Sequence, residues 1–252
     1  MYLDRFVAAK ERSAEGGHLE PGYLSSVSES LIPYYSIRVS AGELLNQLEN
    51  LLKKPSELYK NEERPLPRVH VERHLFSSLL LKPEDHKLEG ISVRPPGLRK
   101  EEADFLADLQ EFWRQHHDDG SYRHKEIYVL RNLPRVGVGF FRRSGFYPDF
   151  ILWIVDKKDK TTQVQFLDPH GLHHGGLSGN RDKIEALKEL KQVSLEAPFK
   201  KKKITMTGYL LTRTKREQIP GAEDKEWDVL EKDYQILRQE GKEYLKKILN
   251  TL

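Results

Sequence analysis

The chain contains no cysteine, which excludes disulfide bonds and thiolate metal sites from its chemistry. It also lacks a long apolar run, because the longest one, Phe150–Val155, is far too short to span a bilayer. The opening residues Met-Tyr-Leu-Asp-Arg show none of the features of a signal peptide. These absences together predict a cytoplasmic protein without a membrane segment.

Two further features are missing, a phosphate-cradling motif and a strong excess of one charge. No Gly-x-x-x-x-Gly-Lys-Ser/Thr motif occurs, so the chain is not expected to act as an ATPase by itself. The 42 lysines and arginines nearly balance the 39 aspartates and glutamates, for a net charge of +3. Such a balance permits nucleic-acid binding without requiring it, so the clustering of basic residues must decide.

The most informative stretch runs from Gly145 to Gly171 and predicts a β-hairpin. Two runs rich in β-branched and aromatic residues flank a charged turn of about seven residues. Asp149 opens the first strand and Asp168 closes the second, so antiparallel pairing brings both acids to the open end of the hairpin. Alternation places His170 on the same side as Asp168. Two carboxylates and a titratable nitrogen can hold a divalent cation, although Pro-Asp and Asp-Pro pairs are also ordinary turn chemistry.

Around this hairpin, the pattern indicates a mixed α/β sheet with helices on both faces. The best domain boundary is Arg94-Pro-Pro-Gly-Leu98, which separates residues 1–94, a mostly helical region or linker, from a domain over 95–252. An apolar stripe predicts a helix over 101–117, with Glu101 and Glu102 in its dipole-favoured first turn. Similar patterns predict helices over 44–52, near 184–190 and over 227–252, and strands over 68–71, 126–130, 136–141 and 204–212.

The hairpin resembles the PD-(D/E)xK nuclease motif. Phe146-Tyr-Pro-Asp-Phe150 matches its first half and Phe166-Leu-Asp-Pro-His-Gly171 its second. The similarity is greatest to the nuclease domain at the C-terminal end of DEAD/DEAH helicases related to type III restriction enzymes. It implies a restriction-endonuclease-like fold and a metal-dependent endonuclease acting on DNA in a restriction or antiviral defence system. It also implies a helicase motor as partner, in the same or a separate chain, with residues 1–94 linking to it.

The resemblance also implies a set of catalytic residues. Asp149 and Asp168 would bind Mg²⁺ or Mn²⁺, with the Pro169 carbonyl as a further ligand. Glu102, preferred over Glu101, would complete the metal shell from the first core helix. His170 stands where the family carries lysine, and it would act either as a base that positions water or as a substitute cation.

Basic residues predict where a nucleic acid would bind. Between Tyr122 and Ser144 six lysines and arginines accompany one acid, with aromatic residues interleaved. The stretch is either a solvated sheet edge or a phosphate-contacting surface, and its place before the acidic hairpin favours the second. The basic run after residue 199 can likewise contact phosphate or solvate a strand. The predicted contacts are Arg131, Arg142, Arg143, Lys200 and Lys201.

Two alternatives remain at this point. His170, His173 and His174 could bind zinc, but no second ligand pair follows at a zinc-type spacing, and the glycine-rich flanks indicate a loop. The chain could also be a catalytically inactive nuclease fold that serves as a DNA-binding or adaptor module.

Overall fold

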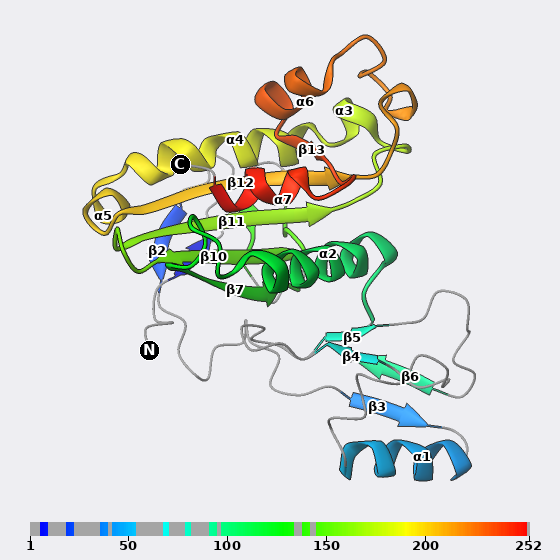
Figure 1. Ribbon diagram of the computed structural model, residues 1–252. Helices are drawn as coiled ribbons and strands as arrows, with labels where there is room; N and C mark the ends of the chain where they lie inside the picture. Colours follow the sequence, from blue (N-terminus) through cyan, green and yellow to red (C-terminus); the bar gives the residue numbers. More distant parts are fainter. Residues whose placement is uncertain are drawn as a thin grey trace.

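The computed structural model describes residues 6–9, 19–22, 36–39, 42–53, 68–70, 79–81, 91–94, 97–133, 138–141 and 145–250. Its main part is a central five-stranded sheet with helices on both faces (Figure 1). The prediction of an α/β fold with a mixed sheet is confirmed. In the ranges described, no helix has the length and apolar character needed to cross a membrane.

The sheet combines antiparallel and parallel pairing. Its order is β13-β12-β11-β10-β7. β10 pairs antiparallel with both β7 and β11, whereas β12 pairs parallel with both β11 and β13. The strand bounds are β7 Lys125–Arg131, β10 Phe150–Asp156, β11 Thr161–Pro169, β12 Ile204–Thr212 and β13 Ile236–Arg238.

The predicted hairpin is confirmed as β10 and β11, with a turn of four residues, 157–160. Phe150 pairs with Leu167, and Asp156 pairs with Thr161. The register therefore places the acids just beyond the last pair, at the open end of the hairpin, as alternation and strand length predicted. The turn is shorter than expected because Asp156 accepts hydrogen bonds from the backbone N–H groups of Lys158 and Asp159.

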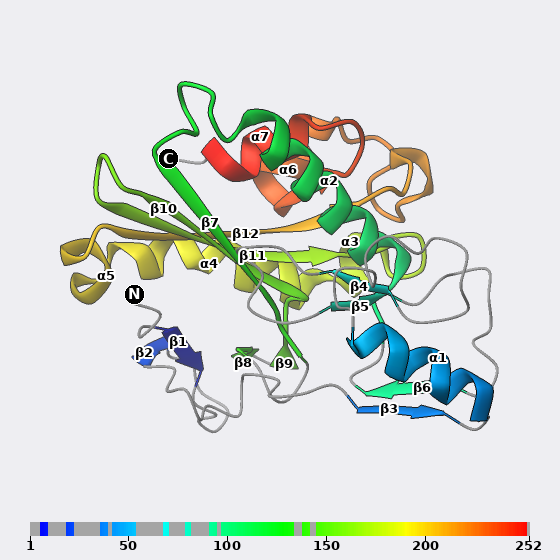
Figure 2. The same cartoon turned by 60° about the horizontal axis from the view of Figure 1, so that its bottom comes forward.

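Helices cover the two faces of the sheet in separate groups (Figures 1 and 2). α2, Lys100–His116, and α7, Glu243–Asn250, share one apolar cluster with the odd-numbered side chains of β7 and the even-numbered side chains of β10. α4, Arg181–Leu195, and α6, Trp227–Tyr234, lie in the other cluster. The shorter elements are α3 Gly176–Gly179, α5 Ala197–Lys201, the 3₁₀ turn η2 Arg216–Gln218, β8 Phe140–Phe141 and β9 Gly145–Phe146.

A glycine in β12 sets how closely α4 approaches the sheet. A β-carbon on Gly208 would lie 2.5 Å from the Leu187 side chain and 2.6 Å from the Phe166 carbonyl oxygen. Only glycine allows this contact, because its bare α-carbon gives the leucine room. Lys183 lies one helical turn before Leu187. The position of α4 therefore determines where the Lys183 ammonium reaches.

The prediction of one long helix over 227–252 was wrong. The segment divides into α6, β13 and α7. Gln235 ends α6 in the left-handed conformation, with φ of 55°, and Gly241 has φ of 61°. Ile236 and Leu237 then pair with Leu210 and Leu211 of β12. Residues at helical spacing are thus distributed over two helices with an edge strand between them.

The described parts of residues 1–94 contain six short strands and one helix, so a mostly helical region was not a correct prediction for them. The strands pair as three small antiparallel ladders: β1 with β2, β3 with β6, and β4 with β5. The helix α1, Gly42–Lys53, includes the segment expected at 44–52. The strand bounds are β1 Phe6–Ala9, β2 Leu19–Gly22, β3 Ser36–Val39, β4 Arg68–His70, β5 Leu79–Leu81 and β6 Ile91–Arg94.

Candidate active site

Asp149 and Asp168 meet at the end of the hairpin. Their carboxyl groups share a hydrogen bond. Asp168 is 3% exposed, so its carboxyl group is almost fully withdrawn from water. Two carboxyl groups can share a hydrogen bond only if one of them carries a proton.

Glu102 reaches the same place from the first turn of α2. Its Oε2 accepts a hydrogen bond of 3.2 Å from the backbone N–H of Arg99 and lies 3.8 Å from the Arg131 guanidinium. Burial raises the pKa of Glu102, and the Arg131 charge partly offsets this effect. The structure therefore brings Glu102, preferred over Glu101 in the sequence, to the two aspartates; the negative charge of Glu102 acts on Asp149.

The electrostatics of the cluster favour the protonated form of Asp149. Burial, followed by the charges of Asp168 and Glu102, raises the pKa of Asp149 to about 9. Lys183 acts in the opposite direction but does not cancel these effects. The folded chain therefore retains a proton on this aspartate at neutral pH, and a cation placed among the three carboxyl groups would compete with that proton.

Lys183 is the residue that sequence reasoning missed. Its Nζ donates a hydrogen bond of 2.8 Å to Oδ2 of Asp168, and it also lies 5.4 Å from the centre of the Phe146 ring. It comes from α4, 15 positions after Asp168, so no motif on the strand could reveal it. The apolar stripe that predicted this helix was the available signal, since Lys183 adjoins Ile184 of that stripe.

His170 follows β11 and is oriented by its surroundings. Its backbone N–H donates to the Leu211 carbonyl at 2.8 Å, and its side chain is hydrogen-bonded to Asn180. Burial and then the positive charge of Lys183 lower the pKa of His170. The imidazole is therefore neutral at pH 7, which favours a role in positioning water over a role as a substitute cation.

Asn132 fixes the backbone that carries Asp149. Its Nδ2 donates to the carbonyl groups of Pro148, at 2.7 Å, and Val138, at 2.8 Å. Its own N–H donates to the Asp149 carbonyl at 2.8 Å, and its Oδ1 accepts from the N–H of Val138. Asn132 is 3% exposed. An amide with donors and an acceptor satisfied inside the protein holds the start of β10 in one position.

The donor set fits a hard divalent cation. Glu102, Asp149 and Asp168 supply only carboxylate oxygens, which are the ligands preferred by Mg²⁺ and Mn²⁺. Across the residues described, no three acidic or histidine side chains already have the spacing to enclose an ion. Lys183 holds Oδ2 of Asp168, and the proton on Asp149 holds the two aspartates together. Binding would require loss of that proton and a local adjustment of side chains.

The residues predicted to contact nucleic acid separate into three groups. Arg131 is 7% exposed and donates to the Gly97 carbonyl at 3.1 Å, so its prediction as a surface contact was wrong, because the side chain is buried against Glu102. Arg142 and Arg143 lie outside the described residues. Lys200 and Lys201 are exposed, but they lie at the opposite end of the sheet from the acids. The predicted contacts therefore do not form one surface.

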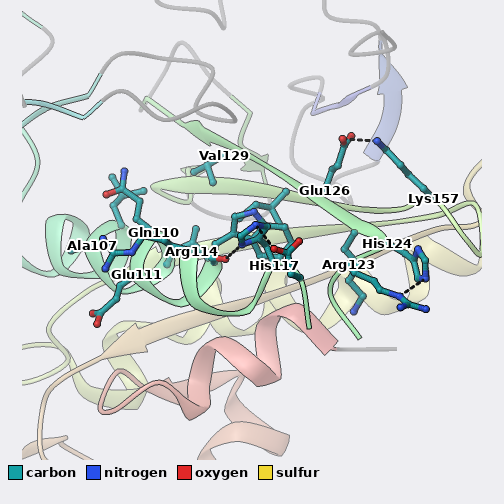
Figure 3. A pocket seen from close by; sticks show the side chains of 16 residues that line it. Ala107, Gln110, Glu111, Arg114, His117, Arg123, His124, Glu126, Val129 and Lys157 are labelled. Carbon is teal, nitrogen blue, oxygen red and sulfur yellow. Dashed lines mark hydrogen bonds and ion pairs between the residues drawn. The ribbon is translucent and has the colours of Figure 1, made fainter. Parts of the chain in front are cut away.

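A pocket of about 690 Å³ lies away from this cluster (Figure 3). Residues from the middle and end of α2, the turn after it and the start of β7 line it. Arg123 donates to His124, and Lys157 pairs with Glu126 at its rim. None of the three acids contributes to the lining. The pocket is therefore separate from the candidate active site.

We expect Arg131→Met to destabilise the fold by on the order of 2–4 kcal/mol, because it leaves the buried Glu102 without its charged partner. Urea denaturation measures the change. Arg181→Met removes an arginine from the exposed pair with Glu185 and should change stability little. Adding Glu102→Gln to Arg131→Met should recover part of the loss. Equal destabilisation by the Arg131 and Arg181 variants would contradict a stabilising interaction of Arg131 with the buried Glu102.

Comparisons with models of protein families, with curated proteins and with solved structures found no match.

Proposed function

We propose that this chain is a metal-dependent endonuclease that hydrolyses phosphodiester bonds of DNA and belongs to the PD-(D/E)xK nucleases. One observation carries the proposal: carboxyl groups from α2, the start of β10 and the end of β11 converge, and an ammonium group lies 2.8 Å from one of them. Acids and a lysine in one cluster are the groups of the motif that the hairpin resembles. A helicase motor as partner in a restriction or defence system remains part of this proposal.

Each side chain has a role that its surroundings support. Glu102, Asp149 and Asp168 would hold Mg²⁺ or Mn²⁺, which supplies a Lewis acid for the phosphate and a more acidic water. Lys183 places a positive charge beside Asp168, where it can orient a water or offset charge that develops on the phosphate. The neutral His170 can accept a hydrogen bond from that water. Lys183 thus takes the place of the lysine that is absent at position 170.

The test is incubation of the purified chain with supercoiled plasmid, with Mg²⁺, with Mn²⁺ or with EDTA. We expect nicked and linear products only with a metal ion. The Asp168→Asn variant, purified in the same way, controls for contaminating nucleases. Plasmid that stays intact with either metal, while the chain still binds duplex DNA, would contradict the proposal and identify a DNA-binding module without catalysis.

A further inference from the structure

The end of the sheet opposite the acids carries a concentrated positive charge. Two segments distant in sequence meet there, the β10–β11 turn and the end of α5 (Figures 1 and 2). The Thr162 N–H donates to the Lys203 carbonyl at 3.1 Å, and Lys203 Nζ donates to the Asp159 carbonyl. We call residues 156–160 and 200–203 the lysine cluster.

The charge of the lysine cluster exceeds that of the whole protein. It contains seven lysines and two aspartates, a net charge of +5, against +3 for the 252-residue chain. Lys157 is paired with Glu126, but in the described part of the chain no carboxylate lies within ion-pair distance of the other six lysines. All seven are exposed. The fold thus gathers unneutralised ammonium groups at one place while the rest of the chain is slightly acidic.

Two of these lysines occupy backbone positions that favour glycine. Lys160 has φ of 54° at the end of the hairpin turn, and Lys203 has φ of 53° just after the C-cap of α5. Turn and helix ends of this kind usually use glycine or asparagine, because a β-carbon is strained in the left-handed region. Lysine at both positions sacrifices some stability and adds charge. Strain retained in a cluster of net positive charge points to a function of that charge.

We infer that the lysine cluster is a phosphate-contacting surface, separate from the acids, which holds the duplex DNA whose cleavage we propose at the acids. The identity of the partner rests on the proposed function. The nine residues of β11 connect the two ends, a separation of about 26 Å. That length corresponds to about eight base pairs. One duplex lying along the sheet would therefore contact both ends, and the cluster would anchor it without reading its sequence.

Binding of a fluorescent duplex of roughly 30 base pairs, several times this separation, tests the inference in EDTA between about 50 and 200 mM salt. Lys160→Gln with Lys203→Gln should lower the log–log salt slope by about 1.8, since each lost phosphate contact removes about 0.9. Lys191→Gln with Lys232→Gln removes the same charge from exposed lysines of α4 and α6 and should leave the slope unchanged. Equal slopes for the two double variants would overturn the inference.

A pair of glycine substitutions separates the effect of the lost charge on binding from the effect of backbone strain on stability. Lys160→Gly with Lys203→Gly should lower the slope equally, yet raise the melting temperature by roughly 2–4 °C per position, because the backbone strain is relieved. Lysine-dependent binding to anionic lipid vesicles, without lysine-dependent binding to the duplex, would overturn the assignment of the partner. Plasmid cleavage reports on the proposed function separately. If the chain cleaves plasmid but the Lys160 and Lys203 double variants keep the wild-type salt slope, only the role of the lysine cluster is refuted. If these variants lower the slope but the chain does not cleave plasmid, only the proposed nuclease activity is refuted.

Discussion

Asp149→Asn should abolish metal-dependent cleavage and at the same time stabilise the metal-free protein. Loss of a ligand oxygen that contributes several kcal/mol to the transition state corresponds to a fall of at least about 10³-fold in rate. The amide can still donate a hydrogen bond to Asp168, and it removes an ionisable group whose pKa is raised to about 9 by burial and neighbouring acids. We expect a gain of on the order of 1–3 kcal/mol in EDTA at pH 8. Plasmid nicking and urea denaturation measure the two effects.

The sign of the stability change follows from the pH dependence of stability. The folded pKa of Asp149 is about 9, and its unfolded value is about 3.9. Between these values the folded chain binds more protons than the unfolded chain, so this residue makes stability fall as pH rises. Asp149→Asn should flatten that decline between about pH 5 and 8. The control is Asp233→Asn, which changes an exposed aspartate of α6. This variant should keep the wild-type cleavage rate and the wild-type decline of stability with pH. A variant at Asp149 that is less stable than wild type at pH 8 in EDTA would disprove the raised pKa of this aspartate.

Lys183→Met should reduce cleavage by about 10²–10³-fold, the range found when one stabilising donor is removed from a transition state. The methionine side chain keeps the length and the packing of α4 but not the charge beside Asp168. Lys183→Arg should recover part of the rate, because the charge is retained. His170→Ala should have a smaller effect, since the neutral imidazole only positions water. Single-turnover cleavage of a short duplex separates these rates from product release.

The matched control lies on the same helix. Lys188 is exposed and lies one helical turn and one residue after Lys183 on α4. The Lys188→Met variant should therefore cleave at the wild-type rate. Duplex binding in EDTA should also be unchanged in the Lys183 variant. If His170→Ala lost the larger part of the rate and Lys183→Met lost none, the lysine of the motif would have no substitute on α4.

The hairpin could be predicted from sequence because its information is local. Alternation, strand length and the charged turn determine the register, and the register places Asp149 opposite Asp168. The position of Lys183 beside Asp168 could not be predicted in the same way. Its position depends on how closely α4 packs against β12, which a glycine at position 208 permits. A residue brought to a site by tertiary packing has no fixed spacing from the motif that it completes.

The burial of Arg131 was also beyond local reasoning. A stretch of alternating basic and aromatic residues is equally compatible with a surface that binds phosphate and with a strand whose last residue turns inward. Only the position of α2 beside the end of β7 shows that Arg131 pairs with Glu102. The prediction of one long helix over 227–252 failed for a related reason. Apolar residues at helical spacing do not reveal that Gln235 takes a left-handed conformation and that Ile236 continues as an edge strand.

The packing of β13 and α7 against the sheet and α2 has a consequence for protein synthesis. Gln239, just after β13, donates to the Glu101 carbonyl at 3.1 Å, and α7 packs in the same apolar cluster as α2. On the ribosome, Glu102 emerges well over a hundred residues before these contacts can form. Glu102 is therefore translated early, while the helix that carries it obtains these supports only after residues 239–250 have left the exit tunnel. The candidate active site is therefore complete only after residues 239–250 have been synthesised, long after Glu102 itself.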